Sequence, residues 1–240
     1  MSAAQALVPL KDLVQAKTRL AGLLRPSERR ALAQAMVQDV LSVLSAHPEV
    51  GPVTLLSDDP GADLLAAKYG CNCLAERELG ASGLNALLEE AVTRLAPGPG
   101  QPVLVLHGDL PLLGRDDITA VLALQRHRGG LVIGCDREGT GTNLLAFEAG
   151  CAVPFRFGPD SCARHLAAAV TAGVTARVLQ RPGIALDIDG PSDMAVLLEA
   201  LDGGETGETA ALLWGTGLGA RLALALETLA PGAHGRTRQC

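Results

Sequence analysis

Three aspartates in this chain are spaced so that they could hold a divalent cation. Asp187 and Asp189 stand at i and i+2 in LDID, and on a short strand expected at Leu186–Ile188 both would point to the same side. Asp109 follows Pro102–Leu106, an apolar run typical of a central strand covered on both faces. Close like charges require a cation, and Mg²⁺ prefers oxygen ligands. We therefore predict all three as metal ligands; the alternative for Asp189 is a cap of the following helix.

A basic loop follows the first expected strand. Lys11, Lys17 and Arg19 stand in VPLKDLVQAKTRL, and three cations near the carboxyl end of a strand could bind a polyphosphate. The alternative is a basic loop that is only solvated. The GxGxxG fingerprint of dinucleotide binding is absent from the sequence, which counts against a nicotinamide-dependent dehydrogenase.

Two glycine-containing segments could bind a small anion. Gly139–Asn143 reads GTGTN, and Phe157–Ser161 reads FGPDS and enters an expected helix. Glycines allow backbone N–H groups to approach a ligand closely, and a helix start with a serine hydroxyl attracts anions. Both segments could hold a small phosphorylated acid. The alternative is two tight turns with Asp160 or Ser161 as an N-cap.

Strands and helices alternate along the chain, which predicts a layered α/β fold with ligands bound at the carboxyl ends of the strands. We expect strands at Ala6–Val8, Pro52–Ser57, Cys71–Ala75, Pro102–Leu106, Leu131–Cys135, Asn143–Phe147, Val174–Leu179 and Leu186–Ile188. We expect helices from Ser27 onward and at Gly61–Tyr69, Leu84–Leu95, Asp116–His127, Ser161–Thr171, Ser192–Leu201 and Gly219–Leu229. Residues 1–203 are expected to form one domain. Residues 204–240 are expected to form a tail with a packing or oligomer helix, and so possible homodimer contacts, before a disordered end at 231–240.

Composition narrows the class of protein. The net charge of −6 argues against a nucleic-acid or anionic-membrane partner, because either would favour a surplus of Lys and Arg. Hydrophobic residues make up 48% of the chain but aromatic residues only 2%, so we expect an aliphatic core. The six cysteines form no CxxC pair and no export signal is visible, which predicts reduced thiols and a cytoplasmic location.

Six motifs in order carry a resemblance to a known family. VPLKDLVQAKTRL, SGLNALL, HGDLPLL, GTGTN, FGPDSCARH and LDIDGPSDM, spread over roughly residues 6–200, resemble the guanylyltransferases of deazaflavin coenzyme (F-420) biosynthesis. The resemblance implies a three-layer nucleotidyltransferase fold, glycosyltransferase-A-like and Rossmann-like, with a mostly parallel central sheet. It also implies that a phosphate oxygen of a three-carbon phospho-acid attacks the α-phosphorus of GTP and that pyrophosphate leaves. The family's acceptors are 2-phospho-L-lactate, phosphoenolpyruvate and 3-phospho-D-glycerate, and its product passes to the deazaflavin-joining transferase.

The resemblance also implies roles for individual residues. Those implied to hold catalytic Mg²⁺ are Asp109, Asp187 and Asp189. Those implied to face the triphosphate are Lys11, Lys17 and Arg19, with Lys17 also catalytic. Those implied to cradle the acceptor phosphate are Thr142, Gly158 and Ser161. Asn85 is implied to help seat the nucleoside, with a helix-start role as the alternative. Leu10 and Asp12 depart from the Val and Pro that we expect in the family's opening motif, and Asp12 is expected to point to solvent.

Two other functions remain open at this stage. One is a nucleotidyltransferase or sugar-transferring enzyme of the same fold with a different acceptor, because function resides in sites and not in folds. The other is a catalytically silent homologue that serves as a binding subunit. A displaced Asp187 or Asp189 would favour the silent homologue.

Overall fold

The computed structural model describes residues 2–11, 13, 17–201 and 206–229. In this part of the chain the strands are β1 (Ala4–Pro9), β2 (Val50–Leu56), β3 (Asn72–Leu74), β4 (Pro102–Leu106), β5 (Leu131–Cys135), β6 (Thr142–Glu148) and β7 (Ala176–Leu179). The α-helices are α1 (Pro26–Ala46), α2 (Ala62–Tyr69), α3 (Leu84–Leu95), α4 (Arg115–Arg128), α5 (Ser161–Thr171), α6 (Pro182–Ala185), α7 (Pro191–Ala200), α8 (Glu208–Gly215) and α9 (Leu218–Leu229). Two short 3-10 helices are η1 (Thr18–Leu20) and η2 (Glu76–Glu78).

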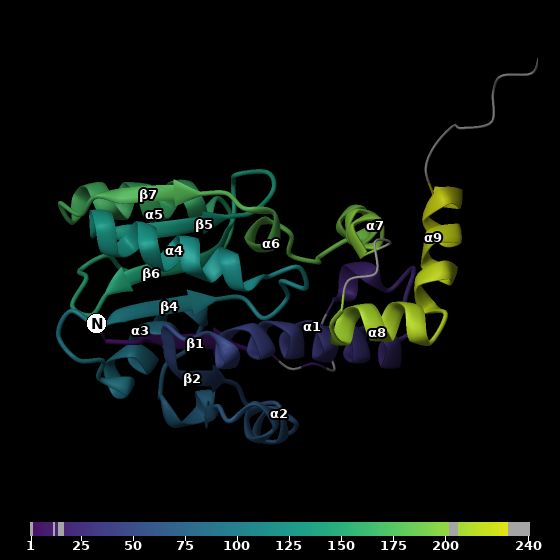
Figure 1. The fold of residues 1–240 in the computed structure, drawn as a ribbon, viewed down its shortest axis with the longest axis horizontal. Helices are drawn as coiled ribbons and strands as arrows, with labels where there is room; N and C mark the ends of the chain where they lie inside the picture. The colour runs from purple at the N-terminus through teal and green to yellow at the C-terminus, as the bar shows by residue number, and fades with distance from the viewer. Residues whose placement is uncertain (1, 12, 14–16, 202–205, 230–240) are drawn as a thin grey trace, which may run out of the picture.

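The described strands form one sheet in the order β3-β2-β1-β4-β6-β5-β7 (Figure 1). β1 pairs in parallel with both β2 and β4, β2 with β3, and β5 with β7, whereas β6 runs antiparallel to β4 and β5. The sheet is therefore mostly parallel, as expected. This order places the carboxyl ends of β1 and β4 side by side, so the loops that follow them share one edge of the sheet.

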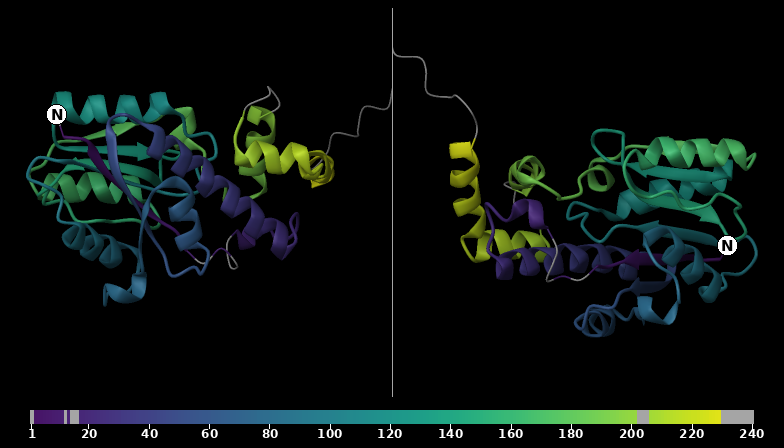
Figure 2. Two further views of the ribbon diagram at one scale, coloured as in Figure 1. Left: turned by 60° about the horizontal axis from the view of Figure 1, so that its bottom comes forward. Right: turned by 180° about the vertical axis from the view of Figure 1, so that it is seen from behind.

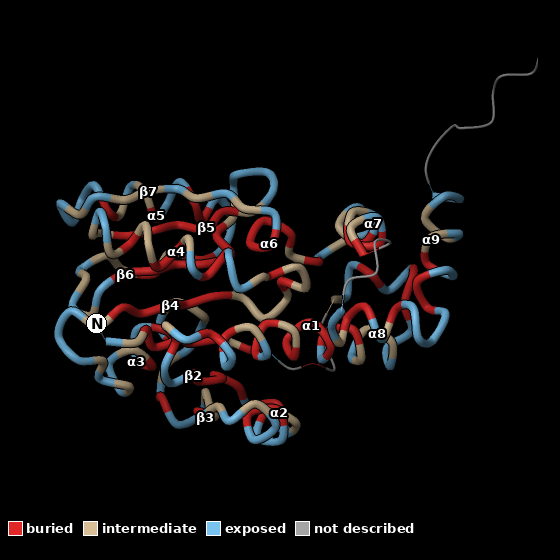
Figure 3. The backbone as a smooth tube through the Cα atoms, viewed as in Figure 1, coloured by how far each residue is buried: buried red, intermediate tan, exposed pale blue. Residues whose placement is uncertain are grey.

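Helices cover both faces of the sheet, because side chains along each strand alternate between two cores. On β1, Ala6 and Val8 belong to the core shared with α1, α2 and α4, while Leu7 belongs to the core shared with α3 and α5. On β4, Leu104 and Leu106 face the first core and Val103 and Val105 the second. The central strands are accordingly buried along most of their length (Figure 3).

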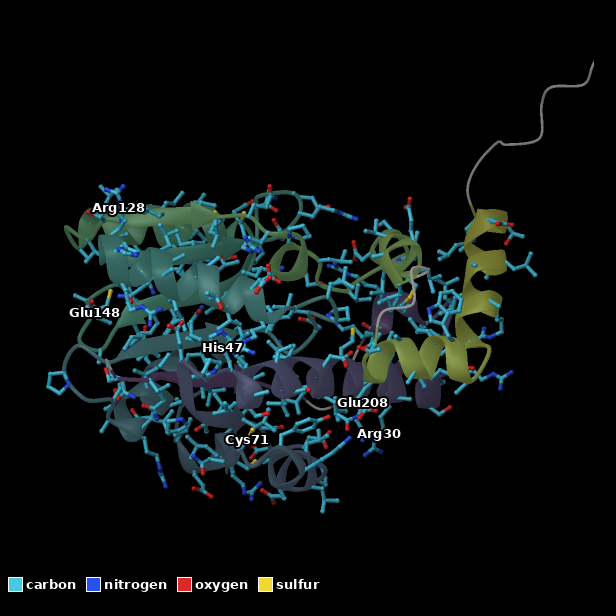
Figure 4. All side chains as sticks on the ribbon, viewed as in Figure 1. Arg30, His47, Cys71, Arg128, Glu148 and Glu208 are labelled. Atoms are coloured by element: carbon cyan, nitrogen blue, oxygen red, sulfur yellow. The ribbon has the colours of Figure 1, made fainter. Side chains whose placement is uncertain are left out.

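A third core lies beyond the end of the sheet. There the N-terminal half of α1 packs with η1, α7, α8 and α9, and the three views agree on this grouping (Figure 2). Asp39 of α1 accepts hydrogen bonds from the backbone N–H groups of Glu208 and Thr209 at 2.6 and 3.0 Å, and so anchors the start of α8, where Figure 4 labels Glu208. The predicted boundary at residue 203 and the predicted disordered end at 231–240 lie outside the described residues.

The strand predicted at Leu186–Ile188 is wrong. This segment is an extended, irregular connection between α6 and α7. Leu186 and Ile188 are buried as the alternating pattern indicates, but they pack in the third core, against helices, instead of in the sheet. The alternating pattern therefore predicted burial correctly. The segment forms no strand, because none of the described strands lies beside it to pair with.

Two further features bear on the sequence analysis. The cysteines at 71, 73, 135, 151 and 162 are all unpaired. Within the described residues no single helix is long and apolar enough to cross a membrane. The pair α8 and α9 reaches that length and composition only together, and the two helices are bent by 76° at the break between them.

Candidate active site

A cleft of about 780 Å³ opens at the sheet edge where β1 and β4 end. Its volume is within the range of small-molecule sites. The residues that line it come from the β1 loop, α1, η2, the start of α3, the β4 loop and the connection before α7: Pro9, Leu10, Lys11, Leu13, Lys17, Thr18, Arg19, Ala33, Met36, Glu76, Gly83, Leu84, Leu87, His107, Gly108, Asp109, Asp187 and Asp189. The three predicted carboxylates and the three predicted cations of the basic loop therefore share one cleft.

Lys17 joins two of the three carboxylates. Its ammonium donates hydrogen bonds to Asp109 at 2.5 Å and to Asp189 at 3.0 Å, and its side chain is only 9% exposed. Burial acts to lower the pKa of Lys17, but the charges of Asp109 and Asp189 outweigh it and raise that pKa. Burial acts to raise the pKa of Asp109, and the charges of Lys17 and His107 outweigh it and lower that pKa. Both groups are thus held in their charged forms.

Asp187 is placed differently. Asn143 of β6 donates from Nδ2 to Asp187 Oδ1 at 3.0 Å and to the carbonyl of Ile184 at 2.9 Å, and so fixes the carboxylate beside α6. Burial raises the pKa of Asp187, the charge of Asp109 raises it further, and the hydrogen bond from Asn143 only partly opposes them. The described contacts of Asp187 supply a neutral donor but no cation.

The capping alternative for Asp189 does not hold. Gly190 occupies the N-cap of α7, and Asp193 accepts hydrogen bonds from the backbone N–H groups of Gly190 and Asp189 at 2.7 and 3.1 Å. The helix start is thus satisfied by Asp193. The Asp189 carboxylate is left to face Lys17 and, at 3.9 Å, Arg19.

The donor set of this edge fits Mg²⁺ in its chemistry. All three candidate ligands offer carboxylate oxygens, and Asp109 Oδ1 is buried without a hydrogen-bond partner in the described part of the chain. Among the described residues, however, no three acidic, histidine or cysteine side chains already converge as a metal site. Lys17 bridges Asp109 and Asp189. The metal role of the three aspartates stays a prediction.

The other two cations of the basic loop are more exposed. Lys11 is exposed at the rim of the cleft, and the Arg19 side chain is 78% exposed. Asp12, which departs from the family motif, lies outside the described residues. Of the three cations, Lys17 is thus the one that the fold buries against the carboxylates. The alternative of a basic loop that is only solvated does not hold for Lys17.

The residues predicted to hold the acceptor lie beside the cleft residues but are not part of its lining. Thr142 and Ser161 are both 2% exposed, whereas Gly158 is exposed with φ +122°. The GTGTN segment meets the start of α5 directly after FGPDS, because the N–H of Cys162 donates to the carbonyl of Thr140 at 3.0 Å. The two segments thus form one structural unit next to α5, and their role in acceptor binding stays a prediction.

His165 of α5 ties this unit together. Its Nε2 accepts a hydrogen bond from the backbone N–H of Arg156 at 2.9 Å, so its Nδ1 carries the proton and lies 3.1 Å from Thr142 Oγ1. Burial lowers the pKa of His165 to about 4, and the ring is fully buried. His165 thus acts as a neutral support for the segment before Gly158.

Asn85 supports the same segment from α3. Its Oδ1 accepts from the N–H of Phe157 at 2.8 Å, and its Nδ2 donates to the Phe157 carbonyl at 3.1 Å. The N-cap of α3 is Gly83, so Asn85 does not cap the helix. These contacts use both polar ends of the amide, and the predicted nucleoside contact of Asn85 stays a prediction.

Sequence analysis missed the supporting roles of Asn143 and His165. Both stand within motifs that carry the resemblance, GTGTN and FGPDSCARH. A buried polar side chain must find hydrogen-bond partners, which is a signal of such a role, but burial itself is not visible in those short motifs.

Solved structures with similar folds define the fold class of this chain. A Desulfovibrio desulfuricans protein, provisionally described as a nucleotide-diphospho-sugar transferase, superposes with a TM-score of 0.74 at 18% identity, covering 93% of this chain and 99% of its own. A 4-diphosphocytidyl-2C-methyl-D-erythritol synthase superposes with a TM-score of 0.59 at 14% identity, covering 84% of this chain and all of its own. The chain therefore has a nucleotidyltransferase-like α/β fold.

Sequence relatives narrow this class to one family. The family model described as "Guanylyl transferase CofC like" matches residues 4–214, which extends past residue 203 into α8. A phosphoenolpyruvate guanylyltransferase of Chloroflexus aggregans is 38% identical over 76% of this chain and 90% of its own length. A 3-phospho-D-glycerate guanylyltransferase of Phenylobacterium zucineum is 34% identical over 85% and 94%. The chain belongs to the CofC-like guanylyltransferase family, and the resemblance drawn from its motifs is confirmed.

Proposed function

We propose that this protein transfers GMP from GTP to the phosphate of a small three-carbon phospho-acid and releases pyrophosphate, as a step of coenzyme F-420 biosynthesis. The observation that carries the proposal is the cleft that Asp109, Asp187 and Asp189 share with the basic loop, in a chain of the CofC-like family. The acceptor is phosphoenolpyruvate, 3-phospho-D-glycerate or 2-phospho-L-lactate. Relatives named for the first two of these acids support this choice.

The reaction joins two anions, so the residues of the cleft must neutralise charge and align the reacting groups. In this proposal Lys11, Lys17 and Arg19 of the β1 loop, which line the cleft, would bind phosphate oxygens of the triphosphate. No covalent intermediate is required, because an acceptor phosphate is already ionised near neutral pH. The product is a guanylylated acid diphosphate, which we expect the deazaflavin-joining transferase to consume.

Asp109, Asp187 and Asp189 would hold Mg²⁺ in this mechanism. The chemistry that Mg²⁺ supplies at such sites is neutralisation of the charge on the transferred and departing phosphates. Among the described residues, Asp109 Oδ1 is buried without a hydrogen-bond partner, and the hydrogen bond to the Asp187 carboxylate comes from the neutral Asn143; both observations support this assignment.

The test incubates the purified protein with GTP, Mg²⁺ and each of the three acids, and follows pyrophosphate release and the mass of the product. We expect pyrophosphate release with at least one of the acids. We expect no release when the divalent cation is left out. Absence of release with all three acids would refute the proposed function. Release that is indifferent to removal of the metal would refute only the metal assignment.

A further inference from the structure

Two chemically different groups of residues line the cleft. One group is the carboxylates and Lys17. The other comes from η2 and the start of α3, where Leu84 and Leu87 are aliphatic and Glu76 contributes a carboxylate. A nucleoside triphosphate whose phosphates meet the first group can direct its base towards the second. Glu76 is then the acidic group that the base would meet.

The Glu76 carboxylate is free to bind a ligand. Its neighbours in η2 are engaged: Arg77 pairs with Asp58 at 3.0 Å, and Glu78 pairs with Arg94 at 3.3 Å. The Glu76 carboxylate makes no hydrogen bond to any residue that the structure describes, although it lies within the cleft lining and is partly buried. The charged groups that act on it are Asp58 and Lys11. A partly buried carboxylate without a donor is costly unless a ligand or water supplies one.

We propose that Glu76 selects guanine by accepting hydrogen bonds from its N1–H and its 2-amino group. This inference rests on the proposed function. A carboxylate offers only acceptors, and its two oxygens match two adjacent donors. Guanine presents two such donors on one edge, whereas adenine presents an acceptor there, which would face the carboxylate unpaired. Aliphatic side chains such as Leu84 and Leu87 supply the apolar surface on which a base of any kind can pack, so discrimination falls to Glu76.

Inosine triphosphate is the probe that isolates this contact, because it differs from GTP by the 2-amino group alone. We expect wild-type protein to bind GTP about tenfold to a hundredfold more tightly than inosine triphosphate, as for loss of a hydrogen bond to a charged group. In Glu76→Gln and Glu76→Ala this ratio should fall to about threefold or less. Glu78→Gln, in the same short helix but paired with Arg94, is the matched control and should keep the wild-type ratio.

Binding is measured by titration calorimetry without any acceptor, so the result does not depend on turnover. A Glu76→Gln protein that keeps the wild-type preference for GTP over inosine triphosphate would overturn the role of Glu76. An equal loss of preference in Glu78→Gln would also overturn it. Absence of pyrophosphate release with every acid would refute the proposed function while leaving the base preference measurable. Glu76→Ala serves as the second variant, because a general folding defect would weaken both nucleotides equally and leave their ratio unchanged.

Discussion

The buried His165 predicts a specific pH dependence of stability. Burial lowers the pKa of His165 from its ordinary value of 6.5 to about 4 in the folded protein. Between pH 4 and pH 6.5 the unfolded chain therefore binds more protons than the folded protein does. The titration of His165 therefore costs almost no free energy of unfolding above about pH 6.5. Below that pH the free energy of unfolding falls as the pH drops towards 4. At ~1.4 kcal/mol per pKa unit, the loss is about 2 kcal/mol by pH 5 and about 3 kcal/mol by pH 4.

The geometry explains why protonation is unfavourable. Nε2 accepts from the backbone N–H of Arg156, so a proton on Nε2 would set two donors against each other. The assay is urea denaturation at intervals between pH 5 and 7.5 for wild-type protein and for His165→Gln, whose amide oxygen can accept from Arg156 but does not titrate. Since other groups titrate in both proteins, the difference between the two curves isolates His165. Parallel curves would refute the reasoning.

Three substitutions test the carboxylate edge. Asp189→Asn should abolish pyrophosphate release with an unchanged circular dichroism spectrum, because Asp193 and not Asp189 supports the helix start; wild-type turnover would contradict its role. Lys17→Met should lower the free energy of unfolding by about 2–4 kcal/mol, because it leaves the Asp109 carboxylate without its cation. Lys11→Met, at an exposed site, is the control, and an effect of Lys17→Met no larger than that of Lys11→Met would contradict the prediction. Asn143→Ala should cost about 2–3 kcal/mol in urea denaturation, from the two acceptors it leaves unpaired, whereas an Ala at exposed Asn72 should cost less than about 0.5 kcal/mol.

Periodicity was sufficient to predict most of the fold. Pro102–Leu106 and Leu131–Cys135 were predicted as strands with the bounds that the structure has, because continuous apolar runs of that length suit central strands. Leu186–Ile188 shows the limit, since alternation indicates burial on one side and does not say whether a strand or a helix packs there. The partner of a segment is a property of the whole fold, so it cannot be obtained from the segment itself.

The candidate site was predictable in part for a similar reason. Asp109 could be proposed from its position after the strand at Pro102–Leu106, and Asp187 and Asp189 from their i, i+2 spacing, although the strand expected there is absent; the motifs supplied a family. The supporting contacts of Asn143 and His165 could not be proposed, because they join separate elements: Asn143 joins β6 to the connection before α7, and His165 joins α5 to Thr142 of β6. Such contacts become visible only once the strand order is known.

Charge is unevenly balanced among the three carboxylates, as the opposite changes in the pKa values of Asp109 and Asp187 show. Asp109 and Asp187 are both withdrawn from water, and burial alone would raise the pKa of each. The pKa of Asp109 is nevertheless lowered, because Lys17 contacts it directly, whereas the pKa of Asp187 stays raised, because its bonded partner is the neutral Asn143. One ammonium is thus shared by Asp109 and Asp189, whereas no ion pair to Asp187 is formed by the residues that the structure describes. A cleft intended for a highly anionic substrate would gain by one further cation at this edge, and Asp187 is the group whose charge that cation would stabilise most.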